Sequence, residues 1–252
     1  MTVPAYLPYY VIGGSLAIIA ALLFGLNRAL VGASWGAAER ARAIRGASLV
    51  LIGWFAASLA LAVLDVYRGV IDEPPTIQYG ILVPILIGAL AIWRSPMAAR
   101  VIDAVPQSWL VGVQLYRALG VIFLVLYASG KLPGLFAWPA GAGDIAVGLL
   151  APIVAALYAR NPAANGGLVG AWNVFGILDL VVAVATGFLT SPSPFQLFAL
   201  DAPNELINVY PLVLVPVFLV PLSILLHIAS LAKLRRSVRA SHAMGRVPAA
   251  AE

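Results

Sequence analysis

Three charged side chains stand out in this sequence because each lies deep within a long run of apolar residues. Arg117, Asp144 and Asp179 occupy three consecutive runs, and each is about ten residues from an end of its run. A charge in such surroundings costs free energy unless it is paired with an opposite charge or reaches water. One cation and two anions at matching depths therefore predict a paired cluster, whose excess negative charge attracts a proton, a cation or water.

Polar and small residues extend this cluster along two of the runs. Gln114 lies three residues before Arg117 and Gly120 three residues after it, so the three share one helix face. Asn173 lies six residues before Asp179, roughly 120° away around a helix, so we expect both to border only a wide cavity. We predict that this cavity lies between the fourth, fifth and sixth runs. The candidate substrate- or ion-binding residues are Arg117, Asp144, Asp179, Gln114 and Asn173.

The apolar runs themselves indicate an integral membrane protein. Hydrophobic residues make up 62% of the 252 residues and charged residues only 10%, whereas ordinary soluble domains carry about 25% charged residues. So few charges cannot form a polar surface, but a surface that faces lipid needs none. Seven runs are each long enough to cross a hydrocarbon core of about 30 Å, which takes about 20 helical residues. They lie near residues 7–27, 47–67, 77–94, 109–129, 135–158, 167–190 and 209–232.

The fold class that we predict is all-α, a polytopic seven-helix bundle in a membrane. It forms one transmembrane domain over residues 1–234, followed by a basic tail over 235–252 that we expect to lack regular structure. Because no charged side chain precedes the first run, we expect it to be retained as a span rather than removed as a signal peptide.

The basic residues predict the orientation of the bundle. Twelve of them lie in one set of alternate loops and in the tail, at 28–45, 94–100, 160 and 233–246, and only Arg68 and Lys131 lie in the opposite loops. Cytoplasmic loops carry the excess of basic residues, so we expect the N-terminus outside and the C-terminus in the cytoplasm. Arginine outnumbers lysine by thirteen to two and alanine is abundant, a bias typical of GC-rich bacterial genomes. We therefore expect a multi-pass protein of a bacterial cytoplasmic (inner) membrane.

Other polar and proline residues in the runs favour structural roles. His227 is a single histidine in the last run, and we interpret it as a hydrogen-bonded structural group. Pro211, Pro216 and Pro221 predict a kink that frees backbone carbonyls in the same run. Asp65 lies near the end of the second run, where we expect it to contact interfacial water.

Several chemistries are excluded by composition. There are no cysteines, so disulfides, thiolate metal sites and cysteine nucleophiles are absent. One histidine in the runs cannot supply a bis-histidine haem or the ligands of a zinc hydrolase. We therefore expect no cofactor and no metal. The net charge of +5 does not indicate nucleic-acid binding, because the basic residues follow the topology pattern. The expected partners are the lipid bilayer and a small polar or ionic solute, and a homo-oligomer is left open.

One short motif suggests a different chemistry. Gly141-Ala142-Gly143-Asp144 resembles the GxGD motif of intramembrane aspartyl proteases. That resemblance implies a second carboxylate that shares a proton with Asp144, from either Asp179 or Asp65. Asp179 follows the motif where the partner in that family precedes it, and Asp65 lies far toward the end of its run. The resemblance covers four residues of the chain.

Three functional hypotheses remain. The first is transport or binding of a small polar or ionic solute, in one version proton-linked, at the Arg/Asp cluster. The second is a membrane sensor or assembly protein in which the cluster is purely structural. The third is a GxGD-type intramembrane aspartyl protease. The sequence leaves enzymatic activity open, favours a non-enzymatic role and indicates no catalytic residue.

The orientation is testable with single cysteines, because the chain contains none of its own. Ser34→Cys and Ser237→Cys should be protected from an impermeant thiol reagent in intact cells, whereas Thr76→Cys should be labelled. Detergent-permeabilised cells provide the control in which all three variants react. Labelling of Ser237→Cys in intact cells would overturn the orientation.

Overall fold

The computed structural model describes residues 2–244, and over this range the fold is all-helical without strands. The first half contains α1 (Leu7–Gly32), α2 (Ala37–Val63), α3 (Ile77–Arg94), α4 (Pro96–Ala104), α5 (Gln107–Gly112), the 3₁₀ segment η1 (Val113–Gly120) and α6 (Val121–Ala128). The second half contains α7 (Gly134–Arg160), α8 (Pro162–Thr190), η2 (Leu206–Asn208), the π-helical segment η3 (Val215–Leu219) and α9 (Val220–Met244).

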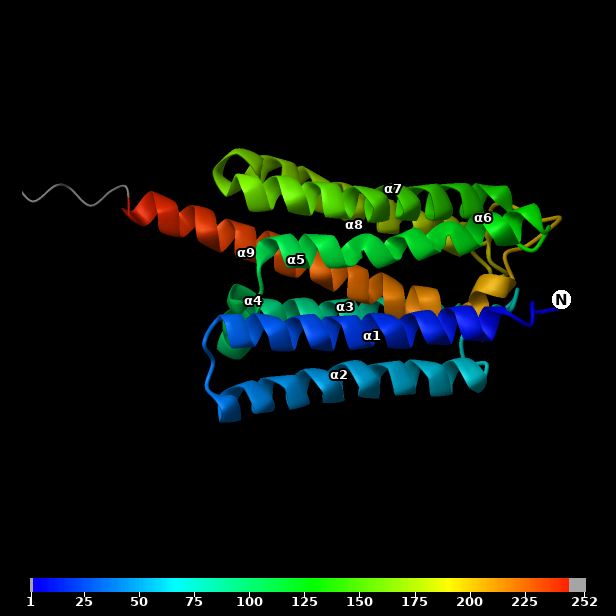
Figure 1. Ribbon diagram of the computed structural model, residues 1–252. Coiled ribbons are helices and arrows are strands. Elements are labelled where there is room, and N and C mark those ends of the chain that lie inside the picture. Colours follow the sequence, from blue (N-terminus) through cyan, green and yellow to red (C-terminus); the bar gives the residue numbers. More distant parts are fainter. Residues whose placement is uncertain (1, 245–252) are drawn as a thin grey trace, which may run out of the picture.

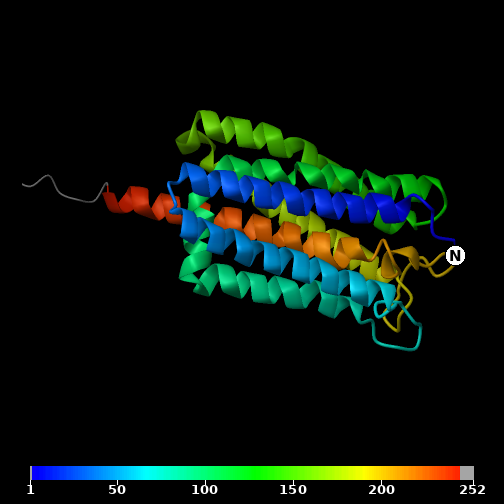
Figure 2. The same ribbon diagram turned by 60° about the horizontal axis from the view of Figure 1, so that its bottom comes forward.

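The long helices lie side by side in one bundle (Figure 1). The N-terminus and the segments 64–76, 129–133 and 191–214 lie at the N-terminal end, on the right of Figure 1, and α4 lies at the opposite, C-terminal end. α9 runs through the interior, where it packs against α3, α5 and α8 (Figure 2). In its most apolar stretch 61% of the residues are buried, compared with 11% in α3. The seventh spanning helix therefore lies at the centre of the bundle.

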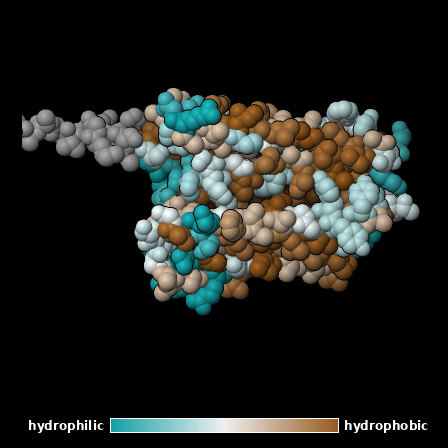
Figure 3. All heavy atoms as spheres, in the orientation of Figure 1, coloured by the Kyte–Doolittle hydropathy of each residue, from teal (hydrophilic) through white to brown (hydrophobic). Residues whose placement is uncertain are grey.

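The outer helix faces are apolar. Large side chains such as Leu49 on α2 and Leu86 and Trp93 on α3 are exposed. Figure 3 shows hydrophobic residues over the middle of one face and hydrophilic residues gathered at its two ends. This is the distribution that a hydrocarbon core flanked by two aqueous interfaces requires. Seven helices of the described chain are long and apolar enough to cross such a core, which indicates a multi-pass membrane protein.

The prediction of seven apolar helices is confirmed, and the differences lie at their ends. The third helix covers 77–94 as expected, whereas α2 begins at Ala37, ten residues earlier than its apolar run. The seventh spanning helix starts at Val215 rather than near residue 209, because residues 209–213 form a bend and turns, and its first five residues are π-helical. α9 continues to Met244, so residues 235–244 of the tail are helical, contrary to our expectation, and residues 245–252 lie outside the described range.

Contacts with α4 explain why the helix continues into the tail. The Lys233 ammonium donates hydrogen bonds to the carbonyls of Ile102, Asp103 and Val105 at the end of α4. The last carbonyls of a helix lack α-helical partners, and within α4 and its cap the Ile102 carbonyl accepts only from the cap amide of Val105, so a lysine beside them is stabilising. Arg236 forms an ion pair of 2.8 Å with the carboxylate of Asp103. Two basic side chains, Lys233 just before the tail and Arg236 within it, thus hold this part of α9 against α4.

The fourth span is not a continuous α-helix, because the 3₁₀ segment η1 separates α5 from α6. A 3₁₀ helix has three residues per turn, so residues spaced by three lie directly above one another. Gln114, Arg117 and Gly120 therefore form one row, and all three are buried. Gly148 of α7 lies against the backbone of η1 at Ala118, where a Cβ atom would overlap the amide nitrogen. α7 and η1 approach closely only because of this glycine.

The prolines of the seventh span lie before its α-helical part or in the first turn of that part. Pro211 precedes the π-helical segment η3, Pro216 lies within it, and Pro221 is in the first turn of α9. Proline lacks the amide proton of an α-helical hydrogen bond and crowds the preceding turn. The expected kink is therefore a short stretch of altered helix rather than a sharp bend.

The close approach of α7 to η1 predicts the effect of adding one methyl group. Gly148→Ala places a Cβ atom against backbone that cannot move aside, and we expect a loss of about 1–3 kcal/mol in stability. Gly53→Ala on α2 is the matched control, because no atom lies within 4 Å of its added Cβ, and it should be neutral or stabilising by up to about 1 kcal/mol. Thermal unfolding in detergent measures the change in stability of each variant. Equal changes for Gly148→Ala and Gly53→Ala would contradict the close packing of α7 against η1.

Candidate functional site

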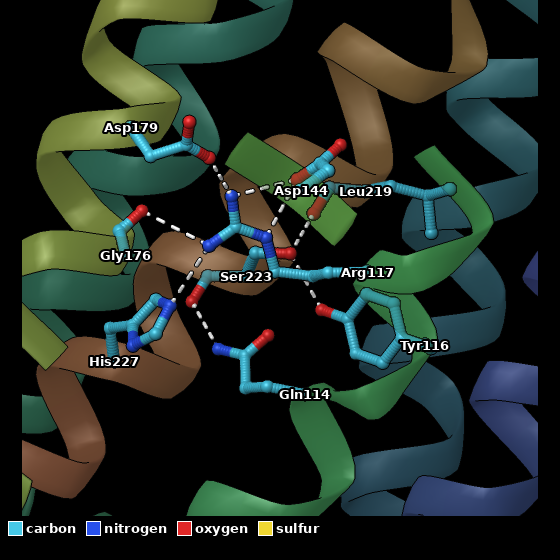
Figure 4. Close-up of polar contacts among 9 residues, drawn as sticks. All are labelled: Gln114, Tyr116, Arg117, Asp144, Gly176, Asp179, Leu219, Ser223 and His227. Carbon is cyan, nitrogen blue, oxygen red and sulfur yellow. Dashed lines mark hydrogen bonds and ion pairs between the residues drawn. The ribbon is translucent and has the colours of Figure 1, made fainter. Parts of the chain in front are cut away.

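The guanidinium of Arg117 lies at the centre of a buried polar cluster (Figure 4). Its Nε donates to Asp144 Oδ1 at 2.7 Å, and its Nη2 forms ion pairs with Asp144 and Asp179. Its Nη1 donates to the carbonyl of Gly176 at 3.1 Å. Arg117 comes from η1, Asp144 from α7, and Asp179 and Gly176 from α8, so one side chain joins three helical segments.

His227 of α9 adds a fourth segment and accepts from the arginine. Asn173 Nδ2 donates to the carbonyl of Val169 and to Ser230 Oγ, so Asn173 Oδ1 faces the imidazole. His227 Nδ1 lies 2.9 Å from this oxygen and donates to it, which leaves Nε2 as the acceptor for Arg117 Nη1 at 3.3 Å. The network therefore assigns a neutral imidazole. One cation and two carboxylates then leave the cluster with a net charge of −1.

Glycines give the charged groups their space. A Cβ atom at Gly143 would overlap a carboxylate oxygen of Asp179, and one at Gly120 would overlap the side chain of Asp144. A Cβ atom at Gly176 would overlap the ring of His227. The small residues expected beside the cluster thus bring its polar side chains against helix backbone, where the Gly176 carbonyl serves as a hydrogen-bond acceptor.

Each aspartate keeps one oxygen free of arginine. Asp144 binds Arg117 through Oδ1 and Asp179 through Oδ2. Within residues 2–244, no hydrogen bond reaches Asp144 Oδ2 or Asp179 Oδ1. The Arg117 side chain is 1% exposed, whereas those of Asp144 and Asp179 are 16% and 9% exposed. The arginine is fully enclosed and Asp144 is the most accessible of the three charges.

Asp144 borders two cavities. The larger, of about 140 Å³, lies along the N-terminal half of α7 and the C-terminal half of α8 and is bordered by α3 and by η3 with the start of α9. The smaller, of about 50 Å³, lies between α1, η1 and α9 and is also lined by Arg117, Tyr116 and Ser223. Tyr116 and Ser223 join their hydroxyl groups by a hydrogen bond of 2.7 Å. Asp144 is the candidate residue that reaches both spaces.

The remaining candidates do not line either cavity. Gln114 donates to the carbonyl of Ser223 at 3.0 Å, and its Oε1 is buried without a partner. Asn173 is held between His227 and Ser230, and Asp179 faces Arg117. The wide cavity expected between the fourth, fifth and sixth spans, bordered by both Asn173 and Asp179, is therefore not found. The ring of His227 lies between Asn173 and the arginine and links these groups by hydrogen bonds.

Sequence reasoning missed most of the contribution of the last helix. Ser223, His227 and Ser230 recur at spacings of four and three residues, which places them on one helix face. Gln107 donates to Ser230 Oγ at 2.6 Å and thereby extends the polar line toward the C-terminal end of the bundle. This spacing was the available signal, because polar residues that share one face of an apolar helix predict a buried polar contact. Considered alone, His227 indicated only a structural group.

The geometry argues against the aspartyl-protease alternative. Asp144 and Asp179 bind the same guanidinium, whereas a protease dyad needs two carboxylates that share one proton. Asp65 lies outside the cluster, in the turn after α2, where its carboxylate pairs with Arg68. The resemblance to intramembrane aspartyl proteases is therefore limited to the four residues of the GxGD motif and does not extend to a catalytic dyad.

A family model described as a domain of unknown function, DUF8737, matches residues 74–235 of the chain. The chain belongs to this family. The matched region begins just before α3 and ends within α9, so it contains every residue of the Arg117 cluster and leaves out α1 and α2. Neither a curated protein nor a solved structure matches the chain.

The cluster predicts a strongly non-additive response to the loss of its arginine. Arg117→Gln leaves two carboxylates uncompensated, and removing one partner of a buried pair typically costs about 3–5 kcal/mol. Adding Asp144→Asn or Asp179→Asn should restore part of that loss, with coupling in a double-mutant cycle. Thermal unfolding of purified variants in detergent measures the coupling.

The exposed pair of Arg68 and Asp65 is the matched control for this cycle. Its side chains are 59% and 41% exposed, and such pairs contribute about 0–1 kcal/mol. Strict additivity of Arg117→Gln with both aspartate substitutions would mean that the arginine pairs with neither carboxylate.

Proposed function

We propose that the chain is a membrane carrier or receptor for a small polar or ionic solute that binds at Asp144. The position of this carboxylate between two cavities carries the proposal. Asp144 has one oxygen on Arg117 and one oxygen free, so a solute can bind without first displacing the arginine. Arg117 is the counter-ion of Asp144, and Asp179 is the second carboxylate that pairs with Arg117.

The charge balance supports a ligand that carries a proton or a positive charge. A net charge of −1 in a low-dielectric interior is costly, and a cation or a proton at Asp144 would neutralise it. Arg117 would remain paired through this change, because Asp179 and the Gly176 carbonyl still accept from it. Asp144 can therefore alternate between arginine and solute without leaving a buried cation alone.

The helices around Asp144 support a site that changes shape. The 3₁₀ segment η1 carries Arg117, and the π-helical segment η3 contributes Val215 and Pro216 to the lining of the larger cavity. Altered helix within a membrane is tolerated where it lines a cavity or packs in protein, and broken helices form the binding sites of many carriers. Both segments lie beside the same carboxylate.

In the orientation that we propose, the N-terminal end faces outward and the C-terminal end faces the cytoplasm of a bacterium, with the bundle in its inner membrane. The excess of basic residues in the C-terminal loops and tail supports this orientation. The larger cavity would then lie in the outward half of the bundle.

The second candidate function is a sensor or assembly protein, for which the cluster only holds helices together. One observation favours it: Arg117 already binds two carboxylates, a carbonyl and an imidazole, from three other helical segments. In that case substitution of Asp144 should change only the stability of the protein.

Native mass spectrometry of the protein purified from its own membranes separates these two functions. We expect the wild type to release a bound small molecule that Asp144→Asn lacks, although the variant remains folded. Glu205→Gln, at an exposed carboxylate in the segment before η2, is the matched control and should retain the molecule. A bound molecule that survives Asp144→Asn, or identical spectra without one, would favour the structural role.

A further inference from the structure

The larger cavity has the size and the lining of a site for a small apolar group. Its volume is about 140 Å³, close to that of an engineered cavity of about 150 Å³ that binds benzene. Its walls are formed mainly by aliphatic and aromatic side chains, among them Ile81, Phe123, Phe136, Leu180 and Val184. A six-membered ring or a short branched alkyl chain would fill it.

Its polar groups lie at the two ends. Asp144 lies at one end, eight residues along α7 from Phe136, and Ser191 and Asn208 lie at the N-terminal end of the bundle. Among the described residues that line this cavity, none is cationic. An anionic ligand would meet a cluster of net charge −1 without a cation facing it, and a neutral ligand would leave that charge uncompensated.

We propose that the larger cavity binds a small organic cation, a primary amine attached to an apolar group no larger than a benzene ring. This proposal rests on the proposed function and names its class of solute. The ammonium group lies at Asp144, where the carboxylate accepts its hydrogen bonds and makes the cluster neutral. Phe123 and Phe136, whose ring centroids are 5.3 Å apart, line the same cavity and provide apolar contact for the ring or alkyl chain of the amine. The apolar group lies toward the N-terminal end.

The smaller cavity has a different character. Its volume of about 50 Å³ is enough for about three to five water molecules, at roughly 10–15 Å³ each. The hydroxyl groups of Tyr116 and Ser223, together with Asp144, supply the polar partners that ordered water needs. Water on this side hydrates the carboxylate, and the larger cavity alone has space for the apolar group of the amine.

Matched probes test the charge and the size of the ligand. Benzylamine, benzyl alcohol and benzoate share one ring and differ in charge, and methylamine has the charge without the ring. Binding to the purified full-length protein at neutral pH is measured by titration calorimetry and by thermal shift. Benzylamine should bind about ten- to hundredfold more tightly than benzyl alcohol, the range that a hydrogen bond to a charged group supplies. Benzoate and methylamine should bind more weakly than benzylamine by at least the same factor.

Three variants assign the binding to this cavity. Asp144→Asn should reduce the affinity for benzylamine to that for benzyl alcohol. Ala183→Leu fills the cavity and should abolish binding of both, whereas Ala185→Leu, on the exposed face of the same helix, should retain both. Because Ala183 is outside the charged cluster, this pair tests the site even where Asp144→Asn does not fold. Equal affinities for benzylamine and benzyl alcohol, or binding unaffected by Ala183→Leu, would overturn the proposal.

The outcomes also separate this inference from the proposed function. The purified protein could carry a solute that depends on Asp144 and yet show no preference for benzylamine. This result would support the carrier or receptor function and would contradict a primary amine as the class of solute. An amine preference that persists in Asp144→Asn would overturn the assignment of the ammonium to this carboxylate.

Discussion

The need to pair one buried guanidinium determines the organisation of this bundle. Arg117 is a permanent charge inside an apolar helix assembly, and each of its nitrogens requires an acceptor because water does not reach it. The acceptors come from α7, α8 and α9, so these helices converge on η1. The glycines follow from the same requirement, since larger residues at 120, 143 and 176 would occupy the space of the charged groups and of His227.

The excess of one carboxylate separates structural from functional roles within the cluster. A single aspartate would neutralise Arg117, and Asp179, which faces the arginine away from the cavities, already supplies that charge. Asp144 is the additional charge, and it is also the charged residue of the cluster that borders both cavities. Exposed pairs such as Arg68 and Asp65 impose no comparable constraint, because water screens both partners.

Sequence reasoning predicted the seven apolar helices because the length and hydrophobicity of a span are local properties. It predicted that Arg117, Asp144 and Asp179 lie together, because unpaired charges in lipid are costly. It did not predict the role of Asn173, whose contact with Arg117 passes through His227 on another helix. The 3₁₀ form of η1 and the helical tail were missed for a related reason. Both depend on tertiary contacts, at Gly148 and at the carbonyls of α4, that no local pattern reveals.

The central position of α9 has a consequence for biosynthesis. A chain is inserted from its N-terminus onward, so this helix enters the membrane after the six others. Until it arrives, Gln107, Gln114 and Asn173 lack the serines, the backbone carbonyl and the imidazole that satisfy them. The polar contacts of these residues with α9 can therefore form only after the seventh spanning helix has entered. Arrival of α9, rather than pairing of neighbouring hairpins, is the event that closes this bundle.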